Sequence, residues 1–236
     1  MKLRIRRQKK EGPPPLILPA GDGTPIQKFS GEVVESLRHM VTRIVRNGQL
    51  PARLSMVSAL RGEGVTYISQ ALAATIANDM KARVCVVDLN WWWPSPIKLA
   101  ARDNPGLAAV LAQKAKLNEI IEPTGWSNLA LIPAGKMSIQ HRPVTARSQE
   151  LREIIDDLGT RFDYLILDVP AIHSTSDAIP LSSLGESCCL VVRQGVTTVE
   201  DARLALDEID HLPVIGVVMN QVKLATPTSI VKLIPA

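Results

Sequence analysis

The sequence is poor in aromatic residues, in cysteine and in long apolar runs. Aromatic residues make up 3% of the 236 residues, and only two of them are tyrosines. The three cysteines, Cys85, Cys188 and Cys189, lie in apolar, strand-like stretches without C-x-x-C spacing, which favours buried thiols over a disulfide or a metal site. No apolar run approaches the roughly 18 residues that cross a bilayer, and no apolar segment follows the basic start. These absences predict a cytoplasmic protein.

Basic charge is concentrated in the first ten residues. The chain carries a net charge of +4, but this segment holds six Lys and Arg and no acid, and removing those six of 27 basic residues leaves 21 against 23 acidic ones. The body of the protein therefore lacks the basic face of a specific nucleic-acid binder. The arm has two open interpretations. It is either a solvated tail or a contact with an anionic membrane, which would hold the protein at the inner face of that membrane.

Beyond the arm, strand-like and helix-like patterns alternate. Residues 1–27 are basic and then proline-rich, which predicts a flexible N-terminal arm, and residues 28–236 predict a single domain. Nearly unbroken apolar runs predict strands within 53–60, 82–90, 128–135, 162–170, 187–195 and 213–222. Helical periodicity appears over 31–47, 67–81, 148–161 and 199–211. This alternation predicts an α/β fold, with three layers built on a doubly wound, mostly parallel sheet.

A glycine-rich loop follows the first of these strands, in the stretch "ALRGEGVT". In the phosphate-binding pattern G-x-x-x-x-G-K-[ST], backbone N–H groups cradle phosphates, the lysine reaches them and the hydroxyl holds Mg²⁺. Gly62, Gly64 and Thr66 fit this pattern, whereas Val65 stands in the place of the lysine. Glycines are also common in any turn from a strand to a helix, so the loop alone does not decide between a phosphate site and a tight turn.

Two carboxylates support the phosphate site. Asp88 ends the strand-like run "VCVVD", and Asp168 ends the run "YLILD". In an open α/β sheet, ligands bind outside the carboxyl ends of the strands, so both acids are expected beside the loop. Carboxylate oxygens are ligands that Mg²⁺ prefers. A single aspartate at a strand end is often only a turn cap, but two of them with the loop favour a nucleotide site.

From about Glu32 to Val222 the chain resembles the cytoplasmic P-loop domain of bacterial tyrosine kinases that govern capsule and exopolysaccharide synthesis. These kinases are related to the plasmid-partitioning and division-site-selection ATPases. The resemblance rests on "SALRGEGVT", "VVDLNWWWP" and "FDYLILDVP", and on "NLALIPAG", "SDAIPLSSLGESCCLVVRQGVTT" and "GVVMNQV". It implies a P-loop NTPase-like fold, binding of ATP or ADP with Mg²⁺, ring-like self-association and activation by a membrane polysaccharide copolymerase.

The resemblance also implies the residues of the site. The implied nucleotide-binding residues are Ser58, Arg61, Gly62, Glu63, Gly64, Val65, Thr66, Tyr67 and Asn220. Thr66, Asp88 and Asp168 are the implied Mg²⁺ ligands, and the two aspartates are the catalytic candidates if the domain is active. The four histidines show no ligand spacing, and no other metal site is expected.

Several positions depart from the family pattern. Val65 replaces the loop lysine, Arg61 replaces the usual preceding proline, and Asn90 replaces the second aspartate of the second motif. The family phosphorylates a C-terminal tyrosine cluster, whereas this chain ends in "TPTSIVKLIPA" and its tyrosines are Tyr67 and Tyr164. The loss of the lysine, of the second acid and of the acceptor tyrosines each weakens phosphoryl transfer, and ATP, ADP and Mg²⁺ are expected to bind weakly or not at all.

Two further segments predict protein contacts. Glu35 and Arg38 retain the family's E-x-x-R-x-x-R self-association motif, although Val41 replaces its last arginine. The residues Trp91, Trp92 and Trp93 replace a basic pair. Because neighbours in an extended stretch point to opposite sides, at least one of these tryptophans is expected at the rim of the site, as an interface residue. Packing within the chain is the alternative.

These observations favour a degenerate domain, inactive or weakly active, that regulates surface polysaccharide synthesis through protein partners. The expected partners are further copies of the chain, an active paralogue or a membrane copolymerase. One alternative is an active kinase or ATPase in which Arg61 replaces the lysine. Another is a scaffold of the partitioning type on a membrane or nucleoid.

Overall fold

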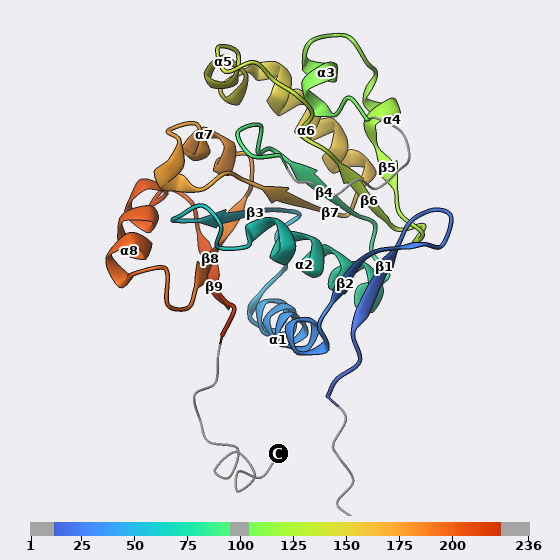
Figure 1. Ribbon diagram of the computed structural model, residues 1–236, viewed down its shortest axis with the longest axis vertical. Helices are drawn as coiled ribbons and strands as arrows, with labels where there is room; N and C mark the ends of the chain where they lie inside the picture. Colours follow the sequence, from blue (N-terminus) through green and yellow to red (C-terminus); the bar gives the residue numbers. More distant parts are fainter. Residues whose placement is uncertain (1–11, 95–103, 223–236) are drawn as a thin grey trace, which may run out of the picture.

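The computed structural model describes residues 12–94 and 104–222, and a seven-stranded sheet forms its centre (Figure 1). The strands follow the order β5-β6-β4-β7-β3-β8-β9, and all of them are parallel except the short edge strand β5. Their bounds are β3 Arg53–Ser58, β4 Val84–Asp88, β5 Glu122–Pro123, β6 Leu129–Ile132, β7 Tyr164–Asp168, β8 Ser187–Arg193 and β9 Val214–Asn220.

Helices cover both faces of this sheet, which gives the three layers that the sequence predicts. Their bounds are α1 Gly31–Asn47, α2 Val65–Met80, α3 Leu107–Leu111, α4 Leu117–Ile120, α5 Arg142–Ala146, α6 Gln149–Arg161, α7 Ala178–Ser182 and α8 Val199–Glu208. A 3₁₀ helix spans Ile172–Ser174. Within the two described ranges, no helix has the length and apolar character to pass through a bilayer. The predicted fold class is confirmed.

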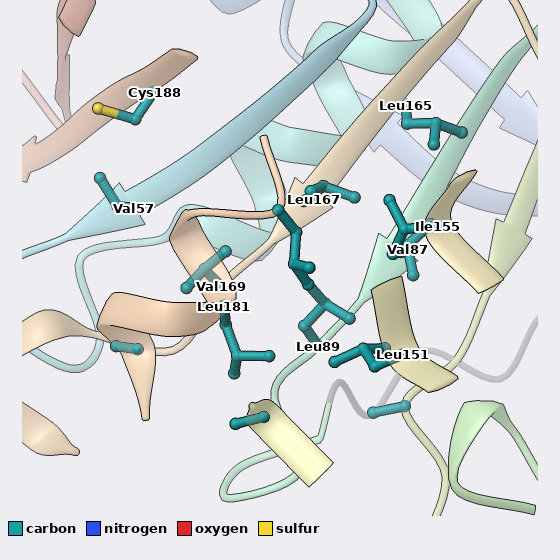
Figure 2. Close-up of a cluster of buried hydrophobic side chains, with 14 of the residues drawn as sticks. Val57, Val87, Leu89, Leu151, Ile155, Leu165, Leu167, Val169, Leu181 and Cys188 are labelled. Atoms are coloured by element: carbon teal, nitrogen blue, oxygen red, sulfur yellow. The ribbon is translucent and has the colours of Figure 1, made fainter. Parts of the chain in front are cut away.

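The two faces have separate cores. On one face α2 packs against the sheet and α1 packs mainly on α2, and the other face is covered by α3, α6, α7 and α8. Figure 2 shows part of the second core, where Leu151 and Ile155 of α6 lie beside Val87 and Leu89 of the β4 region. The strands are apolar on both sides because both sides are covered. The three cysteines are free and buried, as predicted, and burial raises the pKa of Cys188 to about 11 and that of Cys189 to about 12.

Helix α1 has the bounds that its periodicity predicts. It begins after Ser30, whose hydroxyl accepts the N–H of Val33 and satisfies one of the free donors of the first turn. Val34, Leu37 and Val41 form its buried stripe. These residues attach α1 to α2 rather than directly to the sheet, so α1 forms an outer wall on this face.

The prediction of a flexible arm over residues 1–27 is wrong for residues 16–27. Strands β1 (Leu16–Pro19) and β2 (Pro25–Phe29) form an antiparallel hairpin, where a flexible segment to residue 27 was expected. Leu18 and Phe29 are almost fully buried in the core on the α1–α2 face. The prolines of this stretch suggested disorder, but Pro19 and Pro25 lie at strand ends, where a missing N–H costs least. Residues 1–11 lie outside the described residues, so the membrane contact of the basic arm stays a prediction.

The hairpin should contribute substantially to stability, because Phe29 is fully buried and its ring lies 5.4 Å from that of Tyr67. We expect Phe29→Ala to lower the free energy of unfolding by about 3–5 kcal/mol, the usual cost of removing a buried aromatic ring. Urea unfolding followed by circular dichroism measures this. Ile17→Ala on the same hairpin is the control, since Ile17 is 45% exposed and its loss should cost about 0.5 kcal/mol or less. Equal effects of the two changes would contradict the burial of the hairpin.

Candidate functional site

A small cleft lies at the carboxyl ends of the central strands. It has a volume of about 200 Å³ and is lined by Ser58, Arg61, Gly62, Glu63, Gly64, Val65, Thr66, Asn90, Trp93, Asp168, Val169 and Ala171. The loop between β3 and α2 forms one wall, and the segments after β4 and β7 form the others. The structure thus brings together most of the residues that the sequence singles out. The volume is below the roughly 300–1,000 Å³ of common small-molecule sites, and it suits phosphate groups rather than a whole nucleotide.

The loop has the backbone shape of an anion cradle. Gly62 and Gly64 have φ angles of 84° and 92°, in the left-handed region that favours glycine. A Cβ atom on Gly64 would lie 2.2 Å from the side-chain nitrogen of Asn220, so no larger residue fits there. Gly64 is also the N-cap of the 16-residue helix α2 and supplies no capping side chain. The first N–H groups of α2 are therefore available to an anion at the positive end of the helix dipole.

Glu63 holds the loop from within. Its side chain is fully buried, and its carboxylate accepts the N–H of Leu60 at 2.8 Å and the hydroxyl of Thr197. Its backbone carbonyl accepts the amide of Asn220 at 2.8 Å. Arg193 donates to the carbonyl of Gly62 at 3.4 Å. The sequence interpretation of Glu63 as a nucleotide ligand overlooked this structural role, and Thr197 and Arg193 were not singled out although they lie in the quoted stretch "VVRQGVTT".

Val65 occupies the first position of α2, and its side chain belongs to the core on the α1–α2 face. It is 9% exposed. The position that carries a lysine in the family pattern is therefore apolar and packed here. No charge from this position reaches the cleft.

Tyr67 does not line the cleft, contrary to its predicted role in nucleotide binding. Its hydroxyl accepts the N–H of Ser30 at 3.3 Å, and its ring packs on Phe29. Successive residues on a helix are turned by about 100°. Thr66 therefore faces the cleft, whereas Tyr67 faces the hairpin. Asn220 also lies outside the cleft lining. Its side-chain amide bonds to the carbonyl of Glu63 beside Gly64 and so holds the loop, and its predicted role in nucleotide binding stays a prediction.

Asp88 and Asp168 lie side by side, since they are directly opposite in the register of β4 and β7. Asp168 is 2% exposed, and its Oδ1 atom is buried without a hydrogen-bond partner in the described structure. Burial raises the pKa of Asp168 well above its usual value, and the charge of Asp88 raises it further, while a hydrogen bond from Thr66 acts in the opposite direction. An Asp88 oxygen accepts the N–H of Asn90 at 2.8 Å.

This pair suits a cation. A buried carboxylate beside a second carboxylate lowers the stability of the fold, because burial and like charge both disfavour its ionised form. Arrangements of this kind are typical of functional sites. An orphaned carboxylate oxygen, a second acid and the Thr66 hydroxyl are oxygen ligands of the kind that Mg²⁺ takes. Across residues 12–94 and 104–222, no group of three or more His, Cys, Asp or Glu could hold a metal. A cation here would therefore rely on these few ligands together with water or phosphate oxygens.

Arg61 and Trp93 meet across the mouth of the cleft. The guanidinium of Arg61 lies 4.5 Å from the centre of the Trp93 ring, a cation–π contact. Asn90 in turn holds Trp93, because its side-chain oxygen accepts the backbone N–H of Trp93 at 3.0 Å. Both residues line the cleft. The second acid of the family motif is thus replaced by a residue that shapes the following turn.

Trp91 is a core residue, and its predicted interface role is wrong. It is 1% exposed, and its indole N–H donates to the carbonyl of Ala134 at 2.9 Å. Trp92 is half-buried, and its ring lies beside that of Trp91. The guanidinium of Arg142 lies 5.5 Å from the centre of the Trp92 ring. The three tryptophans lie in a bend rather than in an extended stretch, so they do not alternate as the sequence interpretation assumed: Trp91 and Trp92 pack on the core, and Trp93 lines the cleft. An interface role for Trp92 and Trp93 stays a prediction.

Arg38 is engaged within the chain. Its guanidinium pairs with Asp79 of α2 at 2.6 Å and with Glu35 at 3.4 Å. The hydrogen bond from Arg38 lowers the pKa of Asp79. Glu35 and Arg38 thus join α1 to α2, and their role in self-association stays a prediction.

Similarity to known proteins agrees with this geometry. No protein-family profile matches the chain. The tyrosine-protein kinase Wzc of Salmonella typhimurium is 27% identical over 162 residues, which are 67% of this chain and 22% of Wzc. The succinoglycan biosynthesis transport protein ExoP of Rhizobium meliloti is 26% identical over 218 residues, which are 85% of this chain and 27% of ExoP. The chain therefore spans about a quarter of the length of these relatives.

Solved structures show the same fold. The kinase domain of Escherichia coli tyrosine kinase Etk superposes with a TM-score of 0.72 and 21% identity, covering 96% of this chain and 88% of that domain. The septum site-determining protein MinD of Pyrococcus horikoshii, solved with Mg-ADP, superposes with a TM-score of 0.58 and 24% identity, covering 78% and 76% of the two chains. The chain is therefore a homologue of the bacterial tyrosine kinases such as Wzc and has the P-loop ATPase fold.

Proposed function

We propose that this chain is a degenerate tyrosine-kinase-like domain, inactive or weakly active, that regulates surface polysaccharide synthesis through protein partners. The single observation that carries the proposal is Val65, an apolar residue packed into the core at the position of the phosphate-binding lysine. The other parts of the loop retain their shape, so the loss is one of charge rather than of fold.

The missing charge weakens transfer more than binding. A lost charge-assisted hydrogen bond to phosphate costs about 1.5–3 kcal/mol in binding. The loss is larger in the transition state of phosphoryl transfer, because charge is spread over the oxygens of the transferred phosphoryl group and positive groups of the site stabilise it. Asn90 adds to this loss, because it replaces a carboxylate of the family motif with a neutral amide. Its side-chain oxygen accepts the backbone N–H of Trp93.

The remaining site fits a magnesium ion and phosphate groups. Thr66, Asp88 and Asp168 would hold the ion, and the N–H groups at the start of α2 would face the phosphates. When bound, the ion supplies positive charge that offsets the charge of phosphate oxygens. The residues of the chain contribute binding and orientation, and we assign none of them a proton-transfer role.

Partners and location belong to the same proposal. Further copies of the chain, an active paralogue or a membrane polysaccharide copolymerase are the expected partners. Such partners place the domain in the cytoplasm, at the inner face of the membrane. The relatives Wzc and ExoP are about four times longer than the matched segment, which is consistent with a domain that works next to other domains or proteins.

One observation favours a second candidate, an active kinase or ATPase. Arg61 lines the cleft and lies over Trp93, so its guanidinium is close to where a phosphate would bind. Release of the cation–π contact, worth about 0.5–1 kcal/mol at an exposed site, would free the charge. The first experiment below separates the two candidates.

Calorimetry with Mg-ATP should detect no site tighter than about 100 μM in the wild type, because a few kcal/mol are lost from a micromolar site. Val65→Lys should improve the affinity about tenfold or more, since the glycines and the start of α2 retain their shape. Val65→Met is the matched control, similar in length but uncharged, and should give no gain. Circular dichroism checks that all three proteins fold.

A micromolar affinity of the wild type would contradict the degenerate site. Arg61→Ala should then abolish binding if the second candidate is right. A Val65→Lys protein that folds but binds no better than Val65→Met would show that the loop does not accept phosphate.

The Asp88–Asp168 pair should lower stability when no cation is bound. Because folding raises the pKa of Asp168, its destabilising effect is absent below the unfolded value of 3.8, grows as the pH rises from there to the folded value, and is fully present above the folded value. We expect Asp168→Asn to raise the free energy of unfolding by about 1–3 kcal/mol at pH 8 in EDTA, with the gain disappearing near pH 4. Urea unfolding across this pH range measures it.

Asp163→Asn is the control for this change. A hydrogen bond from Arg83 lowers the pKa of Asp163, so its removal should leave stability unchanged or reduce it at neutral pH. A loss of stability in Asp168→Asn at pH 8 would mean that the carboxylate is needed for the fold rather than for a cation.

A further inference from the structure

In the described part of the chain, the turn after β4 makes two contacts between an arginine and a tryptophan ring. In the first of them, Arg142 lies 5.5 Å from the centre of the Trp92 ring and also donates to the carbonyl of Met137 at 3.2 and 3.3 Å. Trp92 packs against the core and is not among the residues that line the cleft. This contact is part of the fold, because its arginine has a backbone partner as well as a ring.

The contact between Arg61 and Trp93 is held less firmly. Arg61 is exposed, and within residues 12–94 and 104–222 its side chain makes no hydrogen bond or ion pair. Its guanidinium therefore depends on the Trp93 ring, whose centre is 4.5 Å away. A cation–π contact at an exposed site is weaker than a charge-assisted hydrogen bond to a phosphate oxygen. A phosphate group in the cleft would therefore compete with the ring for Arg61.

The backbone on both sides of this contact is fixed. The side-chain oxygen of Asn90 accepts the backbone N–H of Trp93 at 3.0 Å. On the other side, the carboxylate of Glu63 accepts the N–H of Leu60 at 2.8 Å, which closes the loop around Arg61. Separation of the two groups therefore requires a rotation of the Arg61 side chain and no change in the loop, and such rotations are fast for exposed residues.

The same contact limits the space in the cleft. Arg61 and Trp93 both line it, and its volume of about 200 Å³ is below that of common small-molecule sites. A free phosphate fits in this volume once Arg61 has turned. A nucleotide also has to place its ribose and base beyond the mouth, so it has to displace the Trp93 ring as well.

We propose that Arg61 and Trp93 form a latch over the phosphate site, and that a phosphate group opens it by drawing Arg61 off the ring. Trp93 is then a specificity-determining residue, which favours inorganic phosphate over a nucleotide. In the open latch, Arg61 supplies part of the positive charge that Val65 lacks. The latch rests on the phosphate site proposed above and gives a second reason, besides Val65, for weak nucleotide binding.

Tryptophan fluorescence tests the opening of the latch. Titration of the wild type with inorganic phosphate and Mg²⁺, against potassium chloride at equal ionic strength, should change the emission in a saturable way, because Trp93 loses the cation on its ring. Trp93→Leu and Arg61→Gln should each lose this change. Trp92→Leu is the matched control, since its ring has the other arginine contact and lies outside the cleft lining, and it should retain the change.

Three results of this titration would overturn the proposal. The first is the absence of a saturable change in the wild type, and the second is a change that Arg61→Gln retains. The third is a change that Trp92→Leu removes, because another ring would then be the reporter. Circular dichroism checks that each variant folds, and Arg61→Gln tests the latch even where Trp93→Leu does not fold.

A ligand-detected NMR titration with Mg-ATP tests the selectivity and measures weak affinities. Trp93→Leu should bind about two- to fivefold more tightly than the wild type, the factor that corresponds to the loss of a cation–π contact at an exposed site. Trp92→Leu should bind like the wild type. A folded Trp93→Leu that binds no better than Trp92→Leu would overturn the latch. The two proposals fail separately, since it is a micromolar affinity of the wild type that contradicts the degenerate site.

Discussion

The parallel pairing of β3 with β7 on one side and β8 on the other determines where the candidate residues of the cleft lie. Parallel strands end at the same edge of a sheet, so the loop after β3 and the aspartates of β4 and β7 are brought to one place. The cleft follows from this arrangement, as does the position of β9 as the outermost strand. The helices on both faces keep the central strands dry, which is why the acids at their ends are buried with them.

The loop after β3 keeps its shape through contacts that do not involve the phosphate-binding position. Glu63 joins the loop to the segment after β8, and Asn220 joins it to the end of β9. Val65 lies at the edge of the cleft and packs into the core of the α1–α2 face. Because the contacts that shape the loop are separate from the charge that serves a phosphate, the lysine could be lost without loss of the fold. This separation is the physical basis of the proposal that the domain keeps the fold of its relatives with a weakened phosphate site.

Stability and function oppose each other at the carboxylate pair. Asp168 has a buried carboxylate oxygen without a hydrogen-bond partner in the described structure and lies beside a second acid. An asparagine in its place would make the fold more stable. Arg38 shows the opposite case, since its ion pair with Asp79 holds α1 on α2 and serves the fold directly. The cost in stability thus lies at the cleft, where we propose that a cation and phosphate groups bind.

The sequence by itself determined the α/β class, the helix over residues 31–47, the six long strands and the convergence of the loop with Asp88 and Asp168. These features depend on local periodicity and on a general property of parallel sheets, so no distant contact needed to be known. Only the tertiary structure decided the rest. The hairpin of β1 and β2 is stabilised by Phe29 against Tyr67, two residues from different segments, and its prolines alone suggested disorder. The burial of Trp91 depends on the carbonyl of Ala134, and the inward role of Glu63 depends on Thr197. A side chain's direction is set by partners far along the chain, and these partners become neighbours only when the sheet has formed.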